Sequence, residues 1–409
     1  MHDQERTRLT FRYERIRAVA SGMLETAGAT FLLLIAVKFL DVGPTAKALV
    51  AGGGSVGLLF SPLVVSMVES RGWVTTRAAA NLAALGAVAF VFMASFANQA
   101  VFVLGSVLTM AAASSAIPLM TQVYQDNYPE AQRGRLFSQS VMLRIATAAL
   151  FSEAAGRFLS LGPTHYRSLL LVYAVAFALA SFCLGRIPSR PLVSSGASHP
   201  LRSLRYAWSD RLFRQTLICW MLMGMGNLMM LPMRVEYLAN PKYNLALSAG
   251  EIAFLLGVVP NCARLIMSPV WGVLFDRMNF FVLRITLNVG FALGILAFFT
   301  SQDVKGLIVG AIIYGVANAG GDVAWGLWVT KFAPAERVAD YMAAHTFFTG
   351  VRGVAAPLIA FHLTRTYSVG VVSGVCIGMI MVANLWLFPE IRHGKNMRRG
   401  AALVEESPE

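Results

Sequence analysis

Twelve runs of apolar residues, each about 20 residues long, limit most strongly what this chain can fold into. A helix of that length crosses a bilayer, and in lipid the backbone must satisfy its own hydrogen bonds. The chain is 56% hydrophobic and 13% charged, whereas ordinary soluble domains are about 25% charged. We therefore expect an all-α membrane protein with twelve transmembrane helices, near residues 17–39, 46–69, 77–97, 100–124, 137–160, 166–187, 214–238, 249–275, 281–301, 305–331, 341–364 and 367–389.

A polar break divides the runs into two sets of six. It contains three prolines, a Ser-Ser-Gly sequence and several arginines, which is typical of a linker. An even number of spans puts both tails on one side, where lysine and arginine are also concentrated, including the pairs Arg71/Arg77 and Arg277/Arg284. By the positive-inside rule we expect that side to be the cytoplasmic side of a cell (inner or plasma) membrane. The expected parts are a cytoplasmic N-terminal tail, a first bundle, a cytoplasmic linker, a second bundle and a cytoplasmic C-terminal tail, over residues 1–16, 17–187, 188–213, 214–389 and 390–409.

The two halves repeat one another. Residues 61–77 read SPLVVSMVESRGWVTTR and residues 268–284 read SPVWGVLFDRMNFFVLR. When the two segments are aligned, both have Ser-Pro, an acidic residue and an arginine at the same positions. A repeat at half the chain length indicates two similar units rather than many small ones. We expect two pseudo-symmetric six-helix bundles.

The second copy of this repeat contains Gly272-x-x-x-Asp276-Arg277 between the eighth and ninth runs. It resembles the loop signature of the major facilitator superfamily of secondary transporters. The resemblance implies alternating access by two bundles that rock around a central site, for which a small-molecule substrate and the bilayer are the partners.

The first copy departs from the signature, because Val65 replaces the glycine, Glu69 the aspartate and Ser70 the basic residue. In the superfamily these loops hold the cytoplasmic ends of the neighbouring bundle. The resemblance therefore implies a cytoplasmic gate or latch made by Glu69, Arg71, Asp276 and Arg277.

Five ionisable residues lie deep inside apolar runs: Glu25, Arg144, Arg264, Asp322 and Arg352. Each costs about 2.5–3.5 kcal/mol on insertion scales, so each indicates a polar pathway or a partner. In the superfamily, helices 1, 4, 7 and 10 line the central cavity, and helices 2, 5, 8 and 11 flank it. All five residues fall on these helices, and we expect them to bind substrate or couple transport.

The roles of these residues remain open between function and structure. Arg144 and Arg352 are either two guanidinium groups that grip an anion or two structural latches. Glu25 and Asp322 either exchange protons, which would make protons the coupling ion, or form fixed ion pairs. Arg264 has no counterpart in the first half, which favours a substrate or coupling role. The amides that could complete the cavity lining are Asn227, Asn261 and Asn318.

Because arginine outnumbers carboxylate three to two among the deep charges, we expect a small anionic or zwitterionic solute. The alternatives are an exporter of drugs or lipids and a transporter-like sensor that moves no solute. The net charge is +13, but the basic residues are scattered among the segments between the apolar runs. This distribution argues against nucleic acid as a partner. We found no catalytic or phosphate-binding motif and no metal or disulfide spacing among the four cysteines, and we expect no enzyme, cofactor or metal.

Overall fold

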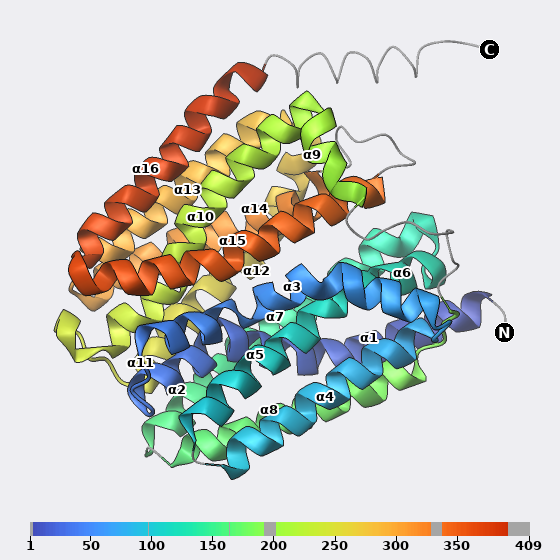
Figure 1. Cartoon of the computed structure of the whole chain (residues 1–409), viewed down its shortest axis with the longest axis horizontal. Coiled ribbons are helices and arrows are strands. Elements are labelled where there is room, and N and C mark those ends of the chain that lie inside the picture. Colours follow the sequence, from blue (N-terminus) through green and yellow to red (C-terminus); the bar gives the residue numbers. More distant parts are fainter. Residues whose placement is uncertain (1–2, 97, 163, 192–201, 329–337, 392–409) are drawn as a thin grey trace.

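The computed structural model describes residues 3–96, 98–162, 164–191, 202–328 and 338–391, which are almost entirely helical (Figure 1). In the first half, the first span is one continuous rod made of α1, a π-helical turn and α2. The elements are α1 (Asp3–Thr26), η1 (Ala27–Phe31), α2 (Leu32–Lys38), α3 (Pro44–Ser70), α4 (Thr75–Ser95), α5 (Gln99–Ser115), α6 (Ile117–Asn127), α7 (Glu130–Ser160) and α8 (His165–Arg186).

The second half repeats this order after two short helical turns. The eighth span of the chain also contains a π-helical turn, which lies between α11 and α12. The elements are η2 (Arg202–Arg205), α9 (Tyr206–Ser209), α10 (Arg211–Ala239), η3 (Pro241–Tyr243), α11 (Ala249–Ala253), η4 (Phe254–Val258), α12 (Val259–Arg277), α13 (Phe280–Thr300), α14 (Val304–Leu327), α15 (Val338–Thr366), α16 (Val369–Leu387) and η7 (Phe388–Glu390).

The helices form two bundles, drawn blue to green and yellow to red in Figure 1. Within the first bundle α4 packs on α8 and α3 on α5, and within the second α13 packs on α14 and α10 on α16. The bundles meet where α3 packs on α15 and where α7 packs on α11 and α12. These contacts join span 2 to span 11 and span 5 to span 8, and a twofold exchange of the halves turns one into the other. The predicted fold of two six-helix bundles is confirmed.

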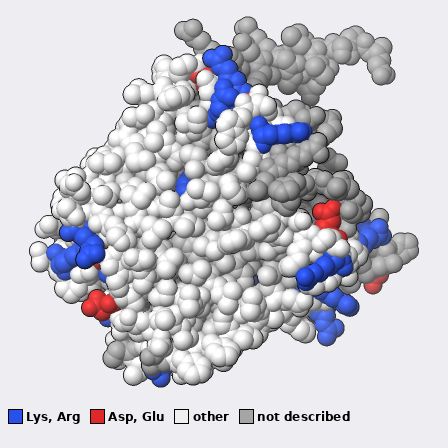
Figure 2. All heavy atoms as spheres, viewed as in Figure 1, with Lys and Arg blue, Asp and Glu red and all other residues white. Residues whose placement is uncertain are grey.

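Eleven described helices are long and apolar enough to cross a membrane. The twelfth, α7, has 31 residues but carries Arg144, Glu153 and Arg157 along its length, which lowers its hydropathy. It crosses the first bundle between α1 and the second half, where neighbouring helices cover it. Figure 2 shows charged side chains gathered toward the ends of the visible face, with a broad and nearly uncharged belt between them.

Glycines allow neighbouring helices to pack closely at some of the helix contacts. A Cβ on Gly53 would lie 3.1 Å from Val107 of α5, and one on Gly294 would lie 3.3 Å from Tyr314 of α14. The stripe Gly370, Gly374 and Gly378 of α16 differs, because nothing but Ser368 comes within 4 Å of a Cβ there. The glycines of α16 therefore point away from its own bundle.

The first residues do not form a separate tail, since α1 begins at Asp3 and continues into the first span. Thr10 and Glu14, both in this segment, are 0% and 2% exposed. Arg284, expected at the cytoplasmic surface, is only 2% exposed because α13 buries it inside the second bundle. Most of the C-terminal tail (392–409) and part of the linker (192–201) lie outside the described residues.

Two ends of the molecule are distinguished below. The linker side carries residues 188–191, α9 and the start of α1, and the far side carries the turns between α2 and α3 and between α7 and α8.

Candidate functional site

Arg264 of α12 ties the two bundles together at the centre of the molecule. Its Nη1 donates to Oε1 of Glu25 in the first bundle at 2.5 Å, and its Nε donates to Oδ2 of Asp322 in the second at 2.5 Å. A third, longer hydrogen bond reaches Oδ1 of Asn261 at 3.4 Å. The guanidinium group thus bridges carboxylates from both halves of the chain.

A second arginine extends this arrangement. Nε of Arg144 in α7 lies 3.0 Å from Oε2 of Glu25, an ion pair without hydrogen-bond geometry. We name Glu25, Arg144, Arg264 and Asp322 the central quartet. Two cations and two carboxylates make it formally neutral.

Solvent reaches the quartet unevenly. The Arg264 side chain is 7% exposed, whereas those of Glu25, Arg144 and Asp322 are 27%, 38% and 42% exposed. A bridging cation therefore lies beneath three groups that water touches. Such partly hydrated ion pairs exchange partners at much lower cost than fully buried ones.

Irregular helix turns lie beside two quartet residues. The π-helical turn η1 begins two residues after Glu25, and η4 ends shortly before Asn261 and Arg264. Single π turns inside helices are frequent at functional sites. The two glycines before Asp322 do not interrupt their helix, since α14 runs unbroken through them and Gly320 packs against Leu287 and Trp271.

The predicted amides divide between two places. Asn261 contacts the quartet through its hydrogen bond with Arg264. Asn318 lies one helical turn before Asp322 on the same face of α14. Asn227 lies elsewhere, in a small cavity between α10, α13 and α14 that Arg234 and Tyr314 also line.

Arg352 does not join the quartet. Its Nη1 donates to the backbone oxygen of Trp220 inside the second bundle, and the side chain is buried. The expected pair of Arg144 and Arg352 around one anion is therefore not present in this structure. Without Arg352, the central charges balance at two arginines against two carboxylates.

A buried ion pair closes the far side. Nζ of Lys47 in α3 donates to both carboxylate oxygens of Glu236 in α10, at 2.8 and 3.0 Å, and these side chains are 8% and 3% exposed. Asn240 adds a hydrogen bond to Glu236 at 2.8 Å. This pair could not be recognised from the sequence, because charges near the ends of apolar runs are ordinary residues of the membrane surface.

Other contacts between the halves gather on the same side. The Gly250 amide donates to Oγ of Ser160 at 2.9 Å, and Lys38 donates to the Leu247 backbone oxygen. A Cβ on Gly156 of α7 would lie 3.2 Å from the Ala249 backbone oxygen. On the far side, the two bundles are therefore so close that the backbone of one contacts the backbone of the other.

The expected gate residues lie on the linker side. Glu69 is partly buried at the end of α3, Arg71 stacks over Trp73 at 5.0 Å, and Arg277 is exposed at the end of α12. The side chain of Asp276 lies outside the described residues. The proposed latch therefore stays a prediction, although the helices it would join, α3 with α15 and α12 with α7, are in contact.

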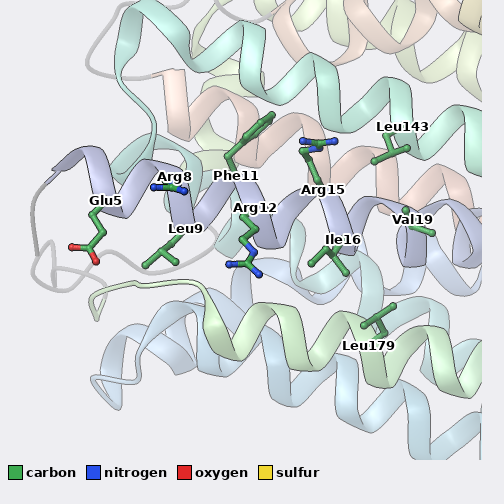
Figure 3. Close-up of a pocket in the computed structure, with 10 residues that line it drawn as sticks. All are labelled: Glu5, Arg8, Leu9, Phe11, Arg12, Arg15, Ile16, Val19, Leu143 and Leu179. Carbon is green, nitrogen blue, oxygen red and sulfur yellow. The ribbon is translucent and has the colours of Figure 1, made fainter.

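A groove with a volume of about 840 Å³ lies apart from the quartet, on the first bundle (Figure 3). Arg8, Arg12 and Arg15 of α1 line it together with apolar residues that include Leu143 and Leu179. Within the described part of the chain, no cluster of histidine, cysteine and acidic residues has the arrangement of a metal site.

Comparisons with known proteins agree with this architecture. The family model described as Major Facilitator Superfamily matches residues 237–406, and no curated protein sequence matches the chain. Three solved structures share the fold. They are a mutant form of the nucleoside transporter NupG (TM-score 0.76, 13% identity, 93% of this chain and 99% of that one), a D-xylose-proton symporter (0.64, 14%, 94% and 96%) and a POT family transporter in complex with a thioalcohol-conjugated peptide (0.71, 12%, 96% and 96%). The second half of the chain therefore matches the Major Facilitator Superfamily model, and the whole chain shares the fold of these solved transporters over at least 93% of its length.

Proposed function

We propose that this protein is a secondary active transporter that moves a small polar solute by alternating access, with the central quartet as its binding and coupling site. The observation that carries the proposal is the position of Arg264, which bonds at once to Glu25 of the first bundle and Asp322 of the second. When the bundles rock apart or together, this bridge must rearrange. A group that bridges both moving bodies is where substrate binding can bias the motion.

The structure corresponds, in this proposal, to the state that is open toward the linker side. The buried Lys47–Glu236 pair and the close approach of Gly156 to Ala249 hold the far side shut. Three quartet residues remain in contact with solvent. Because arginine and lysine favour the cytoplasmic side, the linker side is cytoplasmic and this state faces inward.

The charge balance favours a zwitterionic substrate over a simple anion. A formally neutral quartet offers a guanidinium group to a carboxylate and a carboxylate to an ammonium group. The related structures are titled as transporters of a nucleoside and of D-xylose and as a complex with a peptide conjugate. Their chemistry supports a polar solute of modest size for this fold.

Proton coupling is the second part of the proposal. Protonation of Asp322, which is 42% exposed, removes the charge that holds Nε of Arg264 and frees that nitrogen for a substrate carboxylate. Glu25 offers the same exchange at Nη1. One related structure is titled as a proton symporter, which supports this coupling.

The test is uptake by purified protein in liposomes, screened over amino acids, short peptides, nucleosides, sugars and organic anions. We expect uptake of a zwitterion that Arg264→Ala abolishes and that a surface variant, Arg157→Ala, preserves. Uptake that survives Arg264→Ala at the wild-type rate would remove the basis of the proposed site. Indifference to an imposed pH gradient would rule out proton coupling.

The same assay separates the alternative functions. A sensor would bind a solute without flux, and a drug or lipid exporter would confer resistance to amphipathic compounds while it ignored polar zwitterions.

A further inference from the structure

The second bundle buries a cluster of aromatic and cationic side chains that the transport site does not use. Trp220 of α10, Arg284 of α13, and His345 and Arg352 of α15 are each at most 5% exposed. None of the four contacts a quartet residue through a hydrogen bond or ion pair within the described part of the chain. We name these four residues the cation cluster.

Both arginines lie near the indole ring of Trp220. The Arg284 guanidinium stacks 3.7 Å from the centre of the Trp220 ring, and its Nη2 donates to Sδ of Met223. The Arg352 guanidinium lies 6.0 Å from the same ring centre and donates to the Trp220 backbone oxygen. Gly224 makes room for Arg352, since a Cβ there would meet its guanidinium group.

Several buried polar atoms in and beside the cluster have no hydrogen-bond partner within the described part of the chain. The unpartnered atoms are Nε of Arg352, Nε1 of Trp220, both ring nitrogens of His345, and the hydroxyls of Thr216 and Thr349. Thr216 and Trp220 share one face of α10, and His345, Thr349 and Arg352 share one face of α15. Unpaired buried donors are rare in native proteins and call for an explanation such as a bound ion.

No carboxylate among the described residues pairs with Arg284 or Arg352. Arg17 in the first bundle, whose side chain is 22% exposed, has a different arrangement, since it donates to both carboxylate oxygens of Glu14 at 2.7 and 2.8 Å. An ion removed from water without a counter-ion is strongly unfavourable. Within the described part of the chain, the arginines of the cation cluster therefore lack a carboxylate of the kind that Arg17 has in Glu14.

We propose that a small monovalent inorganic anion of the size of chloride binds in the cation cluster, between the guanidinium groups of Arg284 and Arg352. The unpartnered nitrogens of Arg352 and Trp220 and the threonine hydroxyls supply its hydrogen-bond donors. A single-atom anion fits the tight packing, in which the His345 ring centre lies 5.3 Å from Trp220 and 5.0 Å from Trp328. The anion is a structural ligand of the second bundle and not the transported solute.

The first measurement is the unfolding temperature of the full-length protein in detergent, with sodium chloride replaced by sodium gluconate at constant ionic strength. We expect a saturable rise of a few degrees with chloride and with bromide, because a ligand that binds only the native state stabilises it. Arg352→Gln and Arg284→Gln should lose this rise. Arg17→Gln removes a partly buried arginine that has its own carboxylate, and this variant should unfold at a lower temperature and keep the rise.

An equal chloride effect in Arg352→Gln and wild type would identify a general salt effect and overturn the proposal. A saturable effect of sulfate or phosphate without one of chloride would overturn the choice of a monovalent ion. Equilibrium dialysis of the wild-type protein with radioactive chloride does not depend on the variants' folding. We expect one bound ion per chain, and the absence of bound chloride at saturating concentration would refute the site directly.

Discussion

Removal of one charge from the buried far-side pair should open that side of the transporter. Glu236→Gln leaves Lys47 with its ammonium group only 8% exposed and no carboxylate at 2.8 Å. Loss of one partner of a buried ion pair costs about 3–5 kcal/mol, because the remaining charge is desolvated and unpaired. In a state open on the far side, water hydrates Lys47, so that the loss falls on the closed state alone.

The resulting population shift is large enough to observe. A difference of about 3 kcal/mol changes an equilibrium constant by roughly two powers of ten, at about 1.36 kcal/mol for each. If one molecule in about a hundred is open on the far side in the wild type, the variant should populate the two states about equally.

The distance between spin labels on the far ends of the two bundles measures this shift. Leu161 at the end of α7 and Tyr367 after α15 are 74% and 53% exposed and accept labels without disturbing the core. Cys262 must first become alanine, because it is exposed whereas the other three cysteines are buried. We expect a second, longer distance to appear in Glu236→Gln.

Two controls make the result decisive. Glu153→Gln removes an exposed pair with Arg157 on the same side and should leave the distances unchanged, since surface pairs contribute about 0–1 kcal/mol. The double variant Lys47→Met and Glu236→Met should restore the short distance, because apolar replacement of a buried pair is often neutral or stabilising. A single short distance in Glu236→Gln would refute the role of this pair in closure.

Three further predictions follow from the same structure. Arg264→Lys should reduce uptake at least about tenfold, since one ammonium group cannot reproduce the separate bonds that Nη1 and Nε make; uptake kinetics in liposomes would measure this, and wild-type rates would contradict it. Gly156→Val should lengthen the distance between the far-side labels, because its Cβ would lie 3.2 Å from the Ala249 backbone oxygen, whereas Gly185→Ala, with open space around it, should not. Glu14→Gln should lower the free energy of unfolding by about 3–5 kcal/mol, because Arg17 and the Tyr124 hydroxyl lose their shared carboxylate; denaturant titration in detergent would detect it, and an unchanged midpoint would contradict it.

The composition of the central site followed from one physical fact, that lipid does not tolerate an unpaired charge. Glu25, Arg144, Arg264 and Asp322 stand out in their apolar runs for that reason, and the structure brings all four together. The intolerance of lipid for unpaired charges does not indicate, however, which partner each charged residue has. Arg352 is equally conspicuous in its apolar run but lies inside the second bundle, because the direction in which a helix presents a residue depends on packing that a run of apolar residues does not specify.

The far-side pair shows a different limit of the sequence. Lys47 and Glu236 stand 189 positions apart, near the ends of their spans. Charges at span ends are common at the membrane surface, where they need no partner. These two residues are buried where α3 and α10 approach each other, and no pattern within either span indicates that approach.

The distribution of exposure among the charges indicates which contacts govern the transport cycle. The far-side pair is nearly dry, whereas Glu25, Arg144 and Asp322 are 27–42% exposed. Exchange of ion-pair partners at these three hydrated members of the quartet therefore costs little free energy. A substrate or a proton can replace one ion pair with another there. Separation of Lys47 from Glu236 requires water to enter a closed interface, and it carries most of the energetic difference between the two states. Under the proposed function, the quartet determines which solute is transported, and the far-side pair determines how often the far side opens.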